Sequence, residues 1–74
     1  NDTWKIDGLE NYPNSEVSVY DNQGKRVLLK ITSGAFEWDG KLNSRILPTG
    51  NYWYNIKVSD GRILNGYLLL KNRN

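Results

Sequence analysis

The sequence predicts an all-β fold, a small β-sandwich of six to seven short antiparallel strands. Three observations lead to this prediction. Apolar and polar residues alternate with a period of two along most of the chain. Clusters of Gly, Asn and Asp interrupt this alternation at a spacing of about 8–12 residues, as in β-sandwiches. No window shows the apolar spacing of an amphipathic helix.

Two hairpins are the clearest units. Residues 16–21 and 26–31 alternate regularly and are joined by an Asp-Asn-Gln-Gly turn. Residues 52–58 and 62–70 are joined by a Ser-Asp-Gly turn, which is a strong hairpin signal. Gly66 interrupts the last strand and indicates a bulge or a close backbone approach.

The remaining segments are shorter. Residues 4–7 alternate and end at a glycine, which predicts a brief strand. Residues 32–36 are typical of a loop, and residues 37–38 of another brief strand. Residues 47–50 form a Leu-Pro-Thr-Gly turn, in which Gly50 is free to take a positive φ.

The chain is long enough for one domain of 74 residues, near the lower size limit for independent folding. It has no cysteine, so no disulfide or thiolate metal site can stabilise it. We expect the aromatic residues to supply the core instead, since each buries about 150–250 Å². They are Trp4, Tyr12, Tyr20, Phe36, Trp38, Tyr52, Trp53, Tyr54 and Tyr67.

Neighbouring residues of a strand face opposite sides of the sheet. In the last hairpin, Tyr52, Tyr54, Ile56 and Val58 therefore share the core face, whereas Trp53, Asn55 and Lys57 share the outer face. Val17 and Val19 likewise face inward. The predicted core includes Trp4, Val17, Val19, Tyr52, Tyr54, Ile56 and residues of the last strand.

The charged residues are dispersed. Ten Lys and Arg against eight Asp and Glu leave a net charge of +2, without the basic cluster that nucleic-acid binding requires. We expect Lys25, Lys30 or Lys57 on edge strands, where charge discourages pairing with other molecules. The longest apolar run covers residues 67–70, far short of the ~20 residues that span a bilayer. No nucleic acid and no membrane insertion are expected.

Catalysis is not expected. The chain has no His and no Cys, which removes the commonest general base and the most reactive nucleophile. The aspartates at 7, 21, 39 and 60 stand beside Gly or Asn, where Asp bonds its own backbone in turns. Asp2 with Asp39 or Asp60 lacks the spacing of a calcium loop. We therefore predict no catalytic residue, no cofactor and no metal site.

The candidate binding residues are those on the predicted outer surface and at the turn tips. Trp53 is the key residue, either as a cross-strand packing partner or as a contact site for a protein or a sugar. The candidates for partner binding are Trp53, Asn55, Lys57, Asn22, Gly24, Asp60 and Arg62.

Short motifs occur in a set order along almost the whole chain. They are Asn1-Asp2-Thr3-Trp4-Lys5-Ile6, Gly8-Leu9, Tyr12-Pro13, Val17-Ser18-Val19-Tyr20-Asp21 before Gly24, Trp38-Asp39-Gly40, Leu47 to Tyr54, Asp60-Gly61-Arg62-Ile63 and Gly66-Tyr67. In this order and separation, they resemble the gliding motility-associated C-terminal domain, the type B sorting domain of type IX secretion substrates in Bacteroidetes. Two features differ: the family's opening Phe-Thr-Pro-Asn stretch is absent, and Asn22-Gln23-Gly24 replaces Arg-Trp-Gly.

The resemblance implies that residues 1–74 form a single C-terminal sorting domain, a small Ig-like β-sandwich, that begins one strand or loop late. Such a domain directs a cargo protein across the outer membrane to the cell surface or the medium. It implies recognition by the outer-membrane type IX machinery and a porin-like partner of the PorP/SprF type. We expect the domain to be a monomer. The cargo is either a gliding adhesin or a secreted enzyme.

Two other functions are open. A carbohydrate-binding module would need at least two coplanar exposed rings, for which Trp53 and Tyr20 are the candidates. An inert Ig-like spacer of a surface adhesin would need no binding residues at all.

Overall fold

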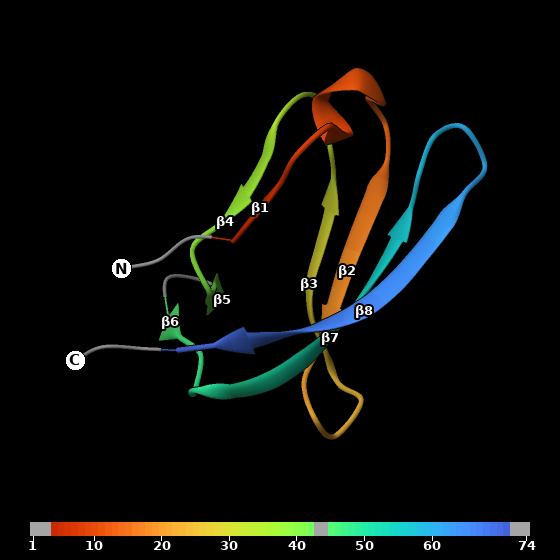
Figure 1. Ribbon diagram of the computed structural model, residues 1–74. Coiled ribbons are helices and arrows are strands. Elements are labelled where there is room, and N and C mark those ends of the chain that lie inside the picture. The colour runs from red at the N-terminus through yellow and green to blue at the C-terminus, as the bar shows by residue number, and fades with distance from the viewer. Residues whose placement is uncertain (1–3, 43–44, 72–74) are drawn as a thin grey trace.

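The computed structural model describes residues 4–42 and 45–71, whose strands form two main layers (Figure 1). The larger layer is an antiparallel sheet in the order β3-β2-β7-β8. Its strands are β2 (Glu16–Tyr20), β3 (Arg26–Ile31), β7 (Gly50–Lys57) and β8 (Ile63–Leu70).

The second layer is the antiparallel pair β1 (Trp4–Ile6) and β4 (Phe36–Trp38). A small antiparallel pair, β5 (Lys41–Leu42) and β6 (Arg45–Ile46), and the 3-10 turn η1 (Leu9–Asn11) complete the described elements. The predicted all-β sandwich is confirmed: among the described residues, six strands contain three or more residues.

Both predicted hairpins form. The β7–β8 pair is continuous from Gly50 opposite Leu70 to Lys57 opposite Ile63. Its three-residue loop ends in Gly61, whose φ of 101° lies in the left-handed region that a side chain disfavours. The Val58 amide donates to the carbonyl of Arg62 at 2.8 Å and closes this loop.

The core lies between the two layers. Val17 and Val19 are fully buried on the inner side of β2, as predicted. The face assignment of β7 is also confirmed, because Tyr52, Ile56 and Val58 are buried and Tyr54 packs against them while half-buried. The buried hydrophobic residues among those described are Leu9, Val17, Val19, Val27, Phe36, Trp38, Tyr52, Ile56, Val58 and Leu70.

Aromatic side chains join the layers. The ring of Trp4 lies 5.1 Å from that of Tyr54 in the large sheet and 5.4 Å from that of Phe36 in β4. Trp38 completes the group at 6.5 Å from Trp4. The loop prediction for Phe36 is wrong: it begins β4 and is buried, because pairing with β1 directs alternate residues of β4 inward.

Gly66 is a site of close approach, without a bulge. It pairs directly with Tyr54, and a Cβ added at Gly66 would overlap the Tyr54 hydroxyl and lie 2.8 Å from its Cε2. The tyrosine ring therefore lies across the backbone of Gly66. Gly50 does not take the predicted positive φ, because it begins β7 as the partner of Leu70.

The prediction of lysines on edge strands holds only in part. Lys30 lies in β3, at one edge of the sheet, and Lys25 just precedes it. Lys57 lies instead in β7, which is an inner strand between β2 and β8. The long-range pairing of β2 with β7 decides this position, and the local alternation pattern does not encode it.

We predict that Tyr54→Ala leaves the domain largely unfolded at 25 °C. Removing a large packed aromatic typically costs ~3–5 kcal/mol, which matches the ~3–5 kcal/mol that a core of this size supplies. Tyr67→Ala in β8 is the control: its side chain is exposed and forms an edge-to-face pair with Trp53, so its loss should cost about 0.5–1.5 kcal/mol, well below the loss of Tyr54. Circular dichroism melts compare the two; a normal melt for Tyr54→Ala would contradict the assigned role.

We predict that Gly66→Ala destabilises the domain by about 1–3 kcal/mol, the usual range for overpacking. Its methyl group would meet the Tyr54 ring. Gly50→Ala is a matched control, since it also lies in a strand of this hairpin but has no atom within 4 Å of the added Cβ. Urea denaturation measures both variants. Equal losses of stability would show that backbone conformation, and not the Tyr54 contact, requires glycine at position 66.

Candidate functional site

The predicted binding residues occupy three separate places. Trp53, Asn55 and Lys57 lie in the middle of the large sheet, on β7. The turn that contains Asn22 and Gly24 follows β2 at one end of this sheet. The turn that contains Asp60 and Arg62 lies at the opposite end (Figure 1). The structure therefore does not bring the candidate residues together in one site.

The outer face of the large sheet carries a row of aromatic side chains. Trp53 pairs with Tyr20 of β2 on one side and with Tyr67 of β8 on the other. The side chain of Trp53 is 48% exposed and that of Tyr67 is 68% exposed, whereas Tyr20 is half-buried. We call Tyr20, Trp53 and Tyr67 the aromatic row.

Tyr67 was not among the residues singled out for partner binding. The three-residue loop between β7 and β8 is symmetric about Asp60, so residues whose numbers add up to 120 face each other. This relation places Tyr67 opposite Trp53. The loop length was visible in the sequence, and extending its register along both strands would have revealed the pair.

Polar groups flank the aromatic row. The Asn55 amide donates from Nδ2 to Oδ1 of Asn65 at 2.5 Å, directly across the two strands. A shallow depression of about 430 Å³ lies here, lined by Tyr20, Trp53, Tyr54, Asn55, Asn65, Gly66 and Tyr67. The depression offers aromatic surface and amide hydrogen bonds but no charged side chain, which suits an uncharged partner.

The two most exposed rings of the row, Trp53 and Tyr67, do not form a flat platform for sugars. Trp53 and Tyr67 meet edge to face, with their centroids 5.6 Å apart and their planes at 69°. A sugar-binding platform requires coplanar exposed rings, which this pair does not provide. The two most exposed rings of this row are therefore arranged for packing against side chains of mixed orientation.

The carboxylates of the turn aspartates Asp21 and Asp39 accept hydrogen bonds from backbone amides of their own turns. Asp21 Oδ1 accepts hydrogen bonds from the amides of Gln23 and Lys25, both at 2.9 Å, and so closes the turn around Gly24. Asp39 accepts the amide of Lys41 at 3.1 Å in the same manner. These contacts confirm the predicted turn role for Asp21 and Asp39.

Asp60 and Arg62 bind each other. The Arg62 amide donates to Asp60 Oδ1 at 3.0 Å, and Arg62 Nε donates to Oδ2 at 2.7 Å. The hydrogen bond from the Arg62 amide, followed by the bond and charge of its side chain, lowers the pKa of Asp60. The Arg62 guanidinium also lies 5.2 Å from the ring centroid of Tyr12. Both side chains are thus engaged in fixing the hairpin loop.

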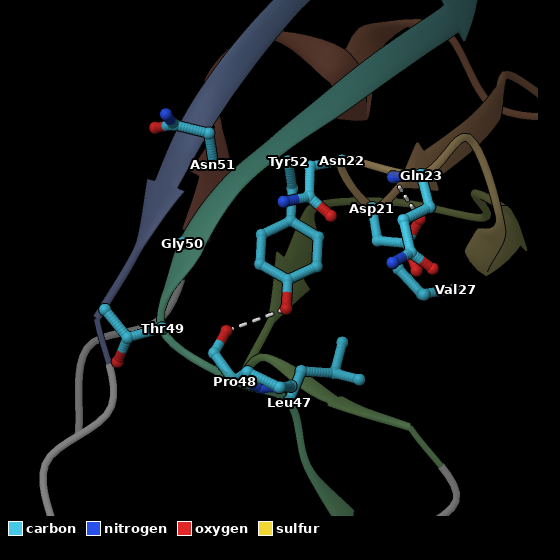
Figure 2. A pocket seen from close by; sticks show the side chains of 10 residues that line it. All are labelled: Asp21, Asn22, Gln23, Val27, Leu47, Pro48, Thr49, Gly50, Asn51 and Tyr52. Atoms are coloured by element: carbon cyan, nitrogen blue, oxygen red, sulfur yellow. Dashed lines mark hydrogen bonds between the residues drawn. The ribbon is translucent and has the colours of Figure 1, made fainter.

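A second cavity, of about 260 Å³, lies at the other end of the sheet (Figure 2). It is lined by residues 21–23, Val27 and residues 47–52. Tyr52 lies at its centre, and its hydroxyl donates to the carbonyl of Pro48 at 2.7 Å. Burial, with a smaller effect of the Asp21 charge, raises the pKa of Tyr52.

This cavity contains one carboxylate, Asp21, whose Oδ1 is occupied by turn amides. Within residues 4–42 and 45–71, no three His, Cys, Asp or Glu side chains lie close enough together to hold a metal ion. Asp2, which was considered with Asp39 or Asp60 as a calcium ligand, lies outside the described residues. No helix in the described part of the chain is long and apolar enough to cross a membrane.

We predict that Tyr52→Phe lowers stability at pH 7 by about 1 kcal/mol, the usual net value of one hydrogen bond. Because the folded state raises the pKa of Tyr52, its contribution is complete below the unfolded value of about 10. It is lost as the pH rises through the folded pKa. The difference between wild type and Tyr52→Phe in denaturant melts should therefore shrink above pH ~10; parallel pH profiles would contradict the shift.

Comparison with known protein families identifies the family to which this small sandwich belongs. The family model described as the CHU_C type IX secretion signal domain matches residues 1–70. No curated protein and no solved structure matches the chain. The family match covers almost the whole sequence and confirms the resemblance to a type IX sorting domain. The chain belongs to the CHU_C type IX secretion signal domain family.

Proposed function

We propose that the outer face of the large sheet is the surface by which the type IX secretion machinery recognises this domain. Domains of this family mark proteins for export across the outer membrane, to the cell surface or the medium. A folded signal can be read only through groups that it exposes. The observation that carries the proposal is the aromatic row. Its exposed members, Trp53 on the inner strand β7 and Tyr67 on the edge strand β8, lie on the face of the sheet opposite the core.

The apolar character of this face supports its role in binding. Besides the aromatic row, its exposed apolar side chains are Leu29, Ile31, Ile63 and Leu69. Contiguous exposed apolar surface on a soluble domain typically marks an interaction site. Tyr and Trp are also the residues most enriched at the energetic centres of interfaces. Lys57 and Glu16 pair beside this surface and supply a polar border.

The partner that we propose is a porin-like outer-membrane protein of the PorP/SprF type, which binds the domain as a monomer. The domain stands at the C-terminus of its cargo, and we assign its sandwich to the Ig-like class. The bond from Tyr52 to Pro48 supports this class, because a tyrosine near the start of a strand that bonds backbone just upstream is a hallmark of Ig-like sandwiches.

The domain itself has no catalytic role in this proposal. It lacks His and Cys, and the carboxylates of Asp21, Asp39 and Asp60 are held by local backbone amides. Any enzymatic or adhesive activity belongs to the cargo to which the domain is attached.

We predict that the domain, fused to the C-terminus of a periplasm-targeted fluorescent reporter, directs the reporter out of a host with the type IX machinery and the cognate partner. Trp53→Ala should reduce the exported fraction severalfold without unfolding the domain, because this side chain is exposed on the proposed contact face. Ile46→Ala is the matched control, since Ile46 is similarly exposed but lies on β6. Fluorescence of the medium and of washed cells measures export.

Retention of the unaltered fusion in the periplasm would contradict the sorting function and favour the spacer alternative. Normal export of Trp53→Ala would retain the sorting function but exclude the aromatic row as its recognition surface. Tyr54→Ala should abolish export, because the surface is assembled only in the folded domain.

A further inference from the structure

The two edges of the large sheet have different chemistry. The β3 edge carries Arg26 and Lys30, and a register shift between Val19 and Tyr20 interrupts its pairing with β2. The β8 edge spans eight residues, Ile63–Leu70, without a charge, a proline or a shift in register. Charges and bulges are the usual means by which an edge strand avoids further pairing. The β3 edge has both, and β8 has neither.

The backbone of β8 has an open side. The hydrogen bond from the Val58 amide to the Arg62 carbonyl sets the alternation of the antiparallel ladder. Leu64, Gly66 and Leu68 then direct their amides and carbonyls toward β7. Those of Ile63, Asn65, Tyr67 and Leu69 point away from it. Within the described residues, β7 is the one strand that pairs with β8.

The same four residues have their side chains on the outer face. Ile63 is 60% exposed and Leu69 is 55% exposed, and between them Tyr67 belongs to the aromatic row. The open backbone edge is therefore continuous with the proposed contact surface. A strand added to β8 would extend the sheet and place its own side chains beside Ile63, Tyr67 and Leu69.

We propose that β8 is the site at which the secretion machinery adds an extended, uncharged segment to the sheet by antiparallel or parallel strand pairing. This inference rests on the proposed function, which requires a protein partner for the folded signal. Strand addition supplies main-chain hydrogen bonds, and side chains at alternate positions supply specificity. The segment is uncharged, because a charge beside β8 would lose hydration without an opposite charge on this strand to compensate.

Leu69→Pro tests this edge. Proline lacks the amide that Leu69 directs outward, while the bonds of Leu68 and Leu70 toward β7 are retained. Leu29→Pro is the matched control, because the bond from the Thr32 amide to Ser15 places the Leu29 amide on the open side of β3. In the export assay, Leu69→Pro should lower export about tenfold below Leu69→Ala, which removes the same side chain but keeps the amide; this factor corresponds to ~1.4 kcal/mol. Leu29→Pro should export within about twofold of Leu29→Ala, because the Leu29 amide has no part in strand addition to β8.

Melting curves establish that each variant folds. If Leu69→Pro does not fold, Leu69→Lys replaces it, since an exposed lysine leaves the backbone intact but introduces a charge on the edge. Normal export of a folded Leu69→Pro or Leu69→Lys variant would overturn the inference. Failure of the unaltered domain to export its reporter would instead overturn the proposed function, so the two failures are distinguishable.

Amide hydrogen exchange of the unaltered domain provides an independent measurement. With the purified porin-like partner in detergent micelles, the amides of Ile63, Asn65, Tyr67 and Leu69 should become protected, and that of Leu29 should not. Binding that protects only other amides would overturn the inference. Concentration-dependent protection of the same four amides without the partner would also overturn it, because the occupant would then be a second copy of the chain.

Discussion

The contact between Trp4 and the Tyr54 ring is the interaction on which the two layers depend. Tyr54 belongs to the large sheet and Trp4 to the small one, and their rings lie 5.1 Å apart. Phe36 and Trp38 extend this contact along β4. A 74-residue chain without disulfides has a small core, so the loss of one large aromatic contact removes a substantial part of its stability. The same contact also requires glycine at position 66, because a side chain there would displace the Tyr54 ring. The hairpin and the core are thus coupled through one tyrosine.

The alternation of β7 connects this core to the proposed contact surface. Tyr52, Tyr54 and Ile56 face inward, so Trp53 must face outward, where it meets Tyr67. The strand that stabilises the sandwich is therefore also the strand that displays the aromatic row. An altered register would remove both features together, since a shift by one residue exchanges the two faces. This coupling gives a physical reason for an export signal to require a folded domain.

The polar side chains fall into two groups: aspartates that hold turns and asparagines on the outer face of the large sheet. Asp21, Asp39 and Asp60 each accept a backbone amide two residues ahead, which is the geometry of an Asx turn. Their carboxylates hold tight turns, and the loops at the two ends of the sheet are thereby well defined. The Asn55–Asn65 pair, by contrast, lies across β7 and β8 beside the exposed rings. It adds hydrogen-bonding groups to an otherwise apolar face.

The sequence by itself determined the features that depend on local backbone preference: the all-β class, both long hairpins, the inward and outward faces of β7 and the turn role of Asp21, Asp39 and Asp60. The resemblance to a type IX sorting domain also came from the order of its motifs. Only the tertiary structure decided that Phe36 joins the core, that Lys57 lies on an inner strand and that β8 is an uncharged edge. These features depend on the pairing of β1 with β4 and of β2 with β7, strands that are distant along the chain. Such pairing is selected by packing of the whole core, which no local pattern of residues encodes.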